Sequence, residues 1–358
     1  MGRVNVLFHL RGFVSDETWL RRARESYLDR GESEPRSLEL LPPHASSRRY
    51  ARVMKADGST EIGMLFPEDS GPEEAGGPVG EGVEDSAFVR AQRWLSAGGV
   101  PVPELYAFDE AQRVLWLEDV GHTDLDAHVA EKALLAPAYH RALDVLQQFQ
   151  AATEEDVPDE VAGRAFDEAL LRWELAHYVE WRLEADLGLS LSADQRAELD
   201  GHFDALAAKI AAMPACVIHR DLQSHNIMVQ PERLVLLDFQ DAMIGPYVYD
   251  AVALLRDSYV SLPTPLLGEL IERFARFAAD THRDGDVAGV IEDVHLQTVQ
   301  RKLKDAGRFV FIDRVKGNPD FLQYRETSLR YVAEALKQLP QLQPLARLLR
   351  ALDPWVVE

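Results

Sequence analysis

The chain has 358 residues, 46% hydrophobic and 27% charged, which is enough apolar material for one large domain or two ordinary ones. Its formal charge of −22 argues against nucleic acid and anionic membranes as partners, because both require a basic footprint. The single cysteine, Cys216, excludes an internal disulfide framework and a cysteine-based zinc site.

The hydrophobic residues are not gathered into membrane segments. No run of 18 apolar residues occurs, so no transmembrane helix is expected. The opening MGRVNVLFHLRGF has neither a long apolar stretch nor a small-residue cleavage site, which argues against a secretory signal. We therefore expect a cytoplasmic protein whose acidic residues form a solvated surface.

The N-terminal third is predicted to form a helix followed by a small sheet. Residues 16–29 place Trp19, Ala23 and Tyr27 on one helical face, within an N-terminal extension that we assign to residues 1–36. Alternating apolar residues, with a turn at Asp57-Gly58, then predict strands at residues 37–41, 48–56, 60–66, 105–108 and 114–117.

One helix and one linker interrupt this series of strands. Residues 85–97 are amphipathic and are expected to pack behind the sheet, with Gly98-Gly99 ending the helix. Residues 68–84 are rich in Gly and Glu but lack Gly-Lys-Ser/Thr, so they predict a flexible acidic linker rather than a phosphate loop.

The remainder of the chain is mostly helical. Apolar spacing at i, i+3 and i+4 predicts helices at residues 124–132, 136–153, 166–186, 192–212, 249–259, 263–280, 287–308, 320–338 and 346–352. The aromatic residues of the third helix are interpreted as core rather than as a sugar platform.

The segment from Cys216 to Asp250 carries the most specific pattern in the chain. Its apolar runs at residues 227–229 and 234–237 are joined by a turn containing Pro231, which predicts a hairpin. Three polar residues lie beside these β-runs and are expected to meet at one end of a small sheet: Asp221, Asn226 and Asp238.

These three residue types suit phosphoryl transfer. An aspartate on a loop can accept or orient a hydroxyl proton, while Asn226 and Asp238 offer the hard oxygen ligands that Mg²⁺ prefers beside nucleotide phosphates. The order H-R-D-x-x-x-x-N followed by an aspartate is that of kinase-type sites. A lone His-x-Asp is common by chance, so the joint spacing carries the interpretation, and His219 is assigned a structural role.

The segment resembles the aminoglycoside/choline phosphotransferase family of the protein-kinase-like fold. Within that family the chain is most similar to the N-acetylmuramate/N-acetylglucosamine anomeric kinases. The resemblance spans roughly residues 40–330 and is carried by LDFQDA (237–242), GPxxYDxxxLLRD (245–257), PxxASxRRYxR (42–52) and VQRxLKxxGxF (299–309).

This resemblance implies an α+β, two-lobed fold with a small antiparallel-sheet N-lobe (37–120) and a large, mostly helical C-lobe (121–358). It implies ATP as donor and Mg²⁺ as cofactor, with Asp221 as the catalytic residue and Asn226 and Asp238 as metal ligands. Further expected roles are nucleotide contacts from Ser46, Ser47, Arg48, Glu118 and Val120, acceptor contacts from Gln223, Gln240, Lys304 and Arg308, and support of the catalytic loop by His219 and Asp250.

Two positions depart from the family pattern. Residues 60–66 contain no lysine to hold the α- and β-phosphates, and Met64 falls roughly where it would sit. The similar sugar kinases also tend to lack this lysine, so Arg48 and Arg49 are the cations that we expect to replace it. His44 occupies a position where the family usually has an aspartate.

The expected reaction is phosphorylation of the anomeric hydroxyl of an amino sugar by a monomeric enzyme. Arg301, Lys302, Lys304 and Arg308 form a basic cluster that is either an anion subsite for N-acetylmuramate or a solvated face. A kinase for an aminoglycoside, choline or another amino alcohol remains an alternative, as does a pseudokinase that only binds nucleotide.

Overall fold

The computed structural model describes residues 15–42, 48–67, 86–153 and 156–357, which fall into two compact units. Unit 1 contains the described residues up to Arg90 together with residues 103–119. Unit 2 contains residues 91–102 and the chain from Val120 onward. The predictions for His44, Ser46, Ser47 and the acidic linker lie outside the described residues.

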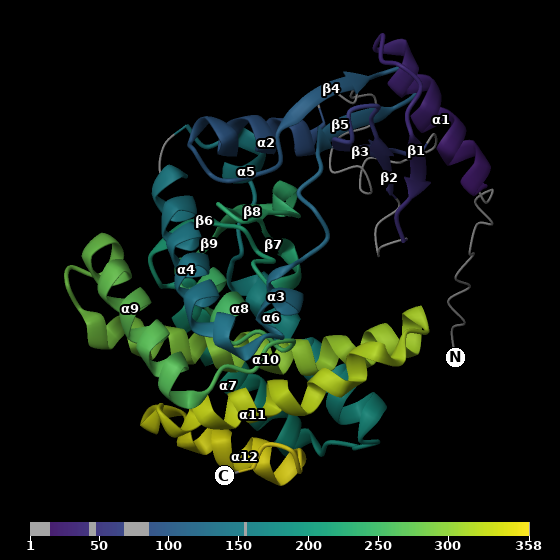
Figure 1. Ribbon diagram of the computed structural model, residues 1–358. Helices are drawn as coiled ribbons and strands as arrows, with labels where there is room; N and C mark the ends of the chain where they lie inside the picture. The colour runs from purple at the N-terminus through teal and green to yellow at the C-terminus, as the bar shows by residue number, and fades with distance from the viewer. Residues whose placement is uncertain (1–14, 43–47, 68–85, 154–155, 358) are drawn as a thin grey trace. The chain divides into compact units, whose positions relative to one another are not determined.

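Unit 1 is built on a five-stranded antiparallel sheet (Figure 1). The strand order is β1 (Ser37–Leu40), β2 (Arg49–Met54), β3 (Thr60–Leu65), β5 (Val114–Glu118), β4 (Leu105–Asp109). All five predicted strands are confirmed. They could be predicted because alternating or continuous burial of β-prone residues leaves a local pattern in the sequence.

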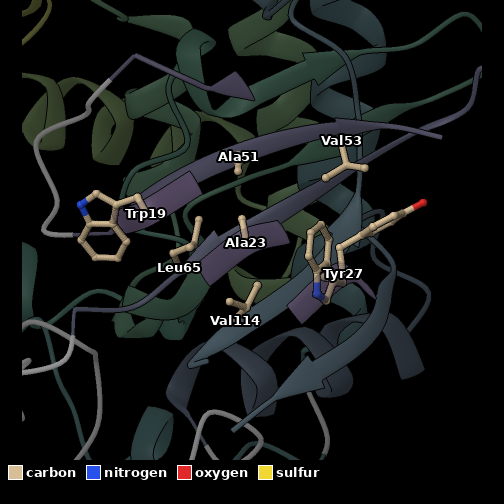
Figure 2. Packing of buried hydrophobic residues seen from close by; sticks show 8 residues of the cluster. Trp19, Ala23, Tyr27, Ala51, Val53, Leu65 and Val114 are labelled. Carbon is tan, nitrogen blue, oxygen red and sulfur yellow. The ribbon is translucent and has the colours of Figure 1, made fainter. Parts of the chain in front are cut away.

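Helix α1 (Asp16–Asp29) covers this sheet and forms its apolar core (Figure 2). Ser15 caps the helix by accepting a hydrogen bond from the Thr18 amide. Trp19, Ala23 and Tyr27 then pack on strand residues from the cluster Ala51, Val53, Leu65, Val114 and Trp116. The helical face predicted from the sequence is thus the face that is buried.

Helix α2 (Ala87–Ala97) begins in unit 1, but residues 91–102 group with unit 2. The helix follows the expected 85–97 closely and ends at Ala97, and Gly99 beyond it has a left-handed φ of +78°. Buried contacts show that α1 packs on the sheet, and the expectation that residues 85–97 pack behind it stays a prediction.

Unit 2 contains two short antiparallel strand pairs, of which only the second is a hairpin. Strand β6 (Ala215–Ile218) pairs with β9 (Met243–Pro246), and β7 (Ile227–Val229) pairs with β8 (Leu234–Leu236). The predicted hairpin at residues 227–237 is confirmed. Strand β9 was not predicted, because Met243–Pro246 contains Gly and Pro and is defined by its distant partner rather than by alternation.

The rest of unit 2 is helical (Figure 1). Its helices are α3 (Leu125–Val129), α4 (Leu135–Ala152), α5 (Asp159–Ala162), α6 (Glu168–His177), α7 (Ala193–Ala211), α8 (Tyr249–Leu255), α9 (Thr264–His282), α10 (Val287–Lys316), α11 (Arg325–Lys337) and α12 (Gln343–Leu352), with a π-helical turn η2 (Tyr178–Asp186) and 3₁₀ turns between some of them.

Several helix boundaries differ from the prediction. The helix predicted at 249–259 ends at Leu255, and α10 continues two turns past Arg308 to a left-handed Gly317. The helix predicted at 320–338 is divided into a 3₁₀ segment, Pro319–Tyr324, and α11. No helix in the described ranges combines the length and hydropathy that a bilayer crossing requires.

Helix α10 is the central element of unit 2, and it contacts α6, η2, α8, α9 and α11. All residues from Leu296 to Leu303 are buried, so this part of the helix has no solvated face. A side chain on Gly307 would collide with the carbonyl oxygen of His177, so the α6–η2 junction approaches this helix closely. The buried polar residues of α10 must therefore find partners inside the protein.

Candidate active site

The loop that carries Asp221 leaves the end of β6 in a strained conformation. Arg220 has φ of +78°, a left-handed value that costs a non-glycine residue about 1–3 kcal/mol. The amides of His219 and Arg220 donate to the two carboxylate oxygens of Asp250, at 2.6 and 3.0 Å. Asp250 is fully buried at the start of α8, and burial raises the pKa of its carboxyl. These bonds hold the strained residue from one side.

His219 itself does not enter the site. Its side chain is fully buried and packs against Phe149, with ring centroids 5.9 Å apart. Neither ring nitrogen has a hydrogen-bond partner among the described residues. By contrast, the Asp221 side chain is 44% exposed and can be reached by a ligand.

Asn226 and Asp238 are connected to Asp221 through hydrogen bonds. The Asn226 side-chain amide donates to the backbone carbonyl of Asp221 at 2.8 Å. The Asn226 carbonyl in turn accepts from the amide of Leu237, at 2.9 Å, immediately before Asp238. The end of β6 and the end of β8 therefore bring the three predicted residues to one place, as the hairpin pattern indicated.

Asp238 also has a left-handed backbone, with φ of +62° and ψ of 35°. Gln240 follows in the same turn and donates its side-chain amide to Asp238 Oδ1 at 2.7 Å. Strained residues of this kind persist where the surrounding structure holds them, and they are concentrated at functional sites. The turn after β8 thus presents the carboxylate of Asp238 in a defined direction.

The donor set at this place suits a hard divalent cation. The Asn226 side-chain nitrogen is committed to the Asp221 carbonyl, so its Oδ1 is the atom left for a ligand. A carboxylate from Asp238 completes a pair of oxygen donors of the kind that Mg²⁺ takes alongside phosphates and water. Within the described ranges no group of three or more His, Cys, Asp or Glu residues forms a protein-only metal site.

Sequence reasoning missed two supports of the loop that carries Asp221. Asp257, fully buried, accepts from the Ser224 amide at 2.8 Å. Asp124 caps α3 and also lies 2.9 Å from Nδ1 of His225, a contact that raises the pKa of this histidine. Asp257 ends the GPxxYDxxxLLRD motif, so a motif signal existed, but nothing local to Asp124 pointed to His225.

A third missed residue is Arg301 on α10. Its guanidinium Nη1 donates to the Arg220 carbonyl at 3.3 Å, and its Nη2 lies 3.9 Å from Asp221 Oδ1. Its side chain is fully buried, with Cζ 4.7 Å from the centroid of the Tyr249 ring. The sequence indicated Arg301 only as one member of a basic cluster, because its partners are about 80 residues away in the chain.

The basic cluster is not the solvated face that one interpretation expected. Lys302 is fully buried and bonds Asp305 at 2.8 Å, and Lys304 bonds the same carboxylate at 3.0 Å. Burial opposes ionisation of Asp305, but the neighbouring lysines and Arg301 together hold the pKa of its carboxyl well below its usual range. Arg308 lies over the ring of Phe311 at 4.8 Å. Most of the cluster is thus internal.

The predicted nucleotide contacts are divided between the two units. Arg48 is buried beside Met64, with Nη1 3.7 Å from its sulfur, and it lies over the Phe66 ring. Glu118 ends β5 in unit 1, whereas Val120 begins the second segment of unit 2 and packs with Met228 and Val235. Arg48 is therefore next to the position where the missing lysine was expected.

The predicted acceptor residues Gln223 and Gln240 lie in the same turns as Asp221, Asn226 and Asp238. The Gln223 amide donates to the Asp221 carbonyl at 2.8 Å, and its own carbonyl accepts from Asn226. Gln240 is the donor to Asp238 already described. Both residues thus shape the two turns through their own hydrogen bonds.

Comparison with known proteins shows the family to which the chain belongs. Residues 46–288 match the family model described as the phosphotransferase enzyme family. A protein of Pseudomonas aeruginosa named N-acetylmuramate/N-acetylglucosamine kinase is 32% identical over 335 residues, which cover 92% of this chain and 93% of that protein. A Pseudomonas putida protein of the same name is 30% identical and covers 90% of each chain.

A solved structure shares the fold. A choline/ethanolamine kinase family protein from Mesorhizobium loti superposes with a TM-score of 0.56 at 17% identity, covering 92% of this chain and 98% of that one. At this identity the likeness concerns the fold alone. It confirms the predicted α+β, protein-kinase-like class with a small sheet unit and a larger, mostly helical unit.

Proposed function

The chain belongs to the phosphotransferase enzyme family, and from this premise we propose that it phosphorylates the anomeric hydroxyl of an amino sugar, N-acetylmuramate or N-acetylglucosamine. The observation that carries the proposal is the hydrogen-bonded set Asp221, Asn226 and Asp238, in a chain similar over nine-tenths of its length to kinases named for these sugars. ATP is the donor, the enzyme acts as a cytoplasmic monomer, and neither nucleic acid nor membrane is a partner.

Asp221 is the proposed catalytic residue. Its carboxylate accepts the proton of the acceptor hydroxyl, or orients that hydroxyl towards the γ-phosphate, because it is the exposed carboxylate on a loop whose backbone is held rigidly. Phosphoryl transfer requires little covalent chemistry from the protein. Much of the catalysis therefore comes from holding the acceptor hydroxyl and the phosphate in position.

Asn226 Oδ1 and the Asp238 carboxylate are the proposed ligands for Mg²⁺. When bound, the ion neutralises charge on the β- and γ-phosphates. Arg48, and not a strand lysine, is the proposed protein cation for the nucleotide, because it lies beside Met64, the position at which the strand lysine was expected. Ser46, Ser47, Glu118 and Val120 complete the proposed nucleotide contacts, the last two through backbone groups.

For the acceptor we propose contacts from Gln223, Gln240, Lys304 and Arg308. N-acetylmuramate carries a carboxylate that N-acetylglucosamine lacks, and a chain of charge −22 needs a local cation to attract it. Arg308 is the more suitable of the two basic residues, because the Lys304 ammonium is already paired with Asp305.

A coupled assay of ADP release with a panel of acceptors tests the function. We expect turnover with both amino sugars and a product whose phosphate is on the anomeric carbon, as measured by ³¹P NMR. Turnover only with choline, ethanolamine or an aminoglycoside would move the chain to another branch of the family. Nucleotide binding without turnover of any acceptor would instead identify a pseudokinase.

The Asp238→Ala variant tests the metal role separately. Removing this carboxylate should weaken binding of Mg-ADP as well as lower the rate, because Asp238 would supply one of the oxygen ligands that hold the ion beside the nucleotide. Thermal-shift titrations with ADP, with and without Mg²⁺, measure the effect. An unchanged apparent Kd for Mg-ADP would contradict metal ligation by Asp238.

A further inference from the structure

We propose that Arg301 is a positioning residue for catalysis, which holds the Asp221 loop at the Arg220 carbonyl while Asp250 holds it at the His219 and Arg220 amides. The proposal rests on the proposed function of Asp221. Arg301 lies on helix α10, far from the loop in sequence, and it is not part of the H-R-D-x-x-x-x-N motif.

The first argument is the way the strained residue Arg220 is held. Its amide donates to Asp250, whereas its carbonyl accepts from Nη1 of Arg301, at 3.3 Å. The peptide groups on both sides of a left-handed residue are thus bonded to buried charged side chains. Since Asp221 follows directly, any relaxation of Arg220 moves the catalytic carboxylate.

The second argument is the unused hydrogen-bonding capacity of Arg301. Its side chain is fully buried, yet Nε and Nη2 have no hydrogen-bond partner in the described part of the chain. Nη2 is 3.9 Å from Asp221 Oδ1, which is an ion pair but not a hydrogen bond. A modest movement of the carboxylate would convert the ion pair into a charge-assisted hydrogen bond, so Arg301 defines where that carboxylate can rest.

The third argument is that neighbouring contacts leave Arg301 little freedom to turn away. Gln300 donates to Glu174 of α6 at 3.0 Å, and α10 approaches the carbonyl of His177 so closely at Gly307 that a side chain there would collide with it. These two contacts lie on either side of Arg301 in the sequence of the helix, so they restrict rotation of α10 about its axis. The Tyr249 ring supports the guanidinium, and this tyrosine directly precedes Asp250. The adjacent residues Tyr249 and Asp250 therefore both support the loop, Tyr249 through the guanidinium of Arg301 and Asp250 through the loop amides.

Arg301→Met and Arg301→Lys test the proposal, with Lys302→Met as the matched control. Lys302 is equally buried on the same helix, but it bonds Ser258 and Asp305 rather than the catalytic loop. For Arg301→Met we expect kcat to fall on the order of tenfold to a hundredfold, as for a catalytic group displaced by about 1 Å. Arg301→Lys should also lose rate, because a single ammonium cannot reproduce the planar fork of arginine.

The measurements must separate positioning from folding. We expect faster amide hydrogen exchange at residues 219–222 in both Arg301 variants, with the Kd for Mg-ADP unchanged, and neither change in Lys302→Met. If Arg301→Met does not fold, Arg301→Lys decides the question by the same readouts. Unchanged exchange at the loop, or an equal loss of kcat in Lys302→Met, would overturn the proposal. If the wild type phosphorylates no amino sugar, the proposed function fails, but the exchange comparison still decides whether Arg301 holds the loop.

Discussion

The interiors of the two units are stabilised in different ways. Under α1 the core is apolar, and Trp19, Ala23 and Tyr27 meet strand residues such as Val53 and Trp116. Around the middle of α10 the interior is polar, with residues such as Gln300, Arg301 and Lys302 fully buried and bonded to other elements.

This difference follows from what each interior must do. Apolar burial is non-directional and stabilises in proportion to area, so it holds a sheet and a helix together without specifying one atom. Buried charges contribute little net stability after desolvation, but each one demands a partner in a defined geometry. A loop that must hold the proposed catalytic carboxylate of Asp221 in one position needs the second kind of interior. Changes near the catalytic loop should therefore lower activity, whereas changes under α1 should lower stability.

The largest expected effect is that of Asp221→Asn on rate. The amide cannot take a proton, so kcat should fall by about 10²- to 10⁴-fold while the protein stays folded and binds nucleotide. Steady-state kinetics and thermal-shift titration with Mg-ADP measure the two properties. Asp241→Asn, an exposed acid in the neighbouring turn, is the control. A variant that retains more than a tenth of the wild-type kcat would show that Asp221 has no such role.

Trp116→Ala should have the converse effect. This side chain is fully buried, donates to Ser26 Oγ at 3.0 Å and lies edge-on to Tyr27. Its removal should lower the free energy of unfolding by about 3–5 kcal/mol, because the cavity cannot be filled. Urea denaturation measures this loss, and Trp173→Ala, at a position 56% exposed, provides the comparison. Equal losses in the two variants would mean that burial under α1 is not what stabilises unit 1.

Arg308→Ala tests whether the basic residues of α10 bind the acceptor. If Arg308 binds the carboxylate of N-acetylmuramate, kcat/KM should fall about ten- to a hundredfold more for this sugar than for N-acetylglucosamine, as expected for a charge-assisted hydrogen bond worth about 1.5–3 kcal/mol. Lys304→Ala should show a smaller selectivity, because Lys304 is paired with Asp305. Arg314→Ala, an exposed cation on the same helix, is the control. Equal effects on both sugars would assign Arg308 a structural role only.

The smallest expected effect concerns pH and the half-exposed pair of His225 and Asp124. The hydrogen bond to Asp124 raises the pKa of His225 in the folded state, so its stabilisation is fully present below the unfolded pKa of about 6.5. It is lost as pH rises through the folded pKa. His225→Gln should therefore cost up to about 1 kcal/mol at pH 5.5 and less at pH 9. Urea denaturation at pH 5.5 and pH 9, with Asp124→Asn measured in parallel, tests this. A loss of unfolding free energy that is the same at both pH values would contradict it.

Much of the architecture could be predicted from the sequence because its signals are local. Residues 16–29 and the five strands of unit 1 follow from apolar periodicity, and the hairpin at residues 227–237 follows from its turn. Asp221, Asn226 and Asp238 could be found because loop and hairpin lie within 18 residues, so their spacing in sequence determines their proximity.

Only the tertiary structure decided which distant residues hold that site. Asp124 meets His225 across 101 residues, and Arg301 meets Arg220 across 81, and neither pairing leaves a periodic trace in the chain. Strand β9 exists because β6 pairs with it, and the basic cluster of α10 is internal because other helices surround it. Local periodicity reports which face of an element is apolar, but the partner of a buried charge is determined by the packing of elements far apart in sequence.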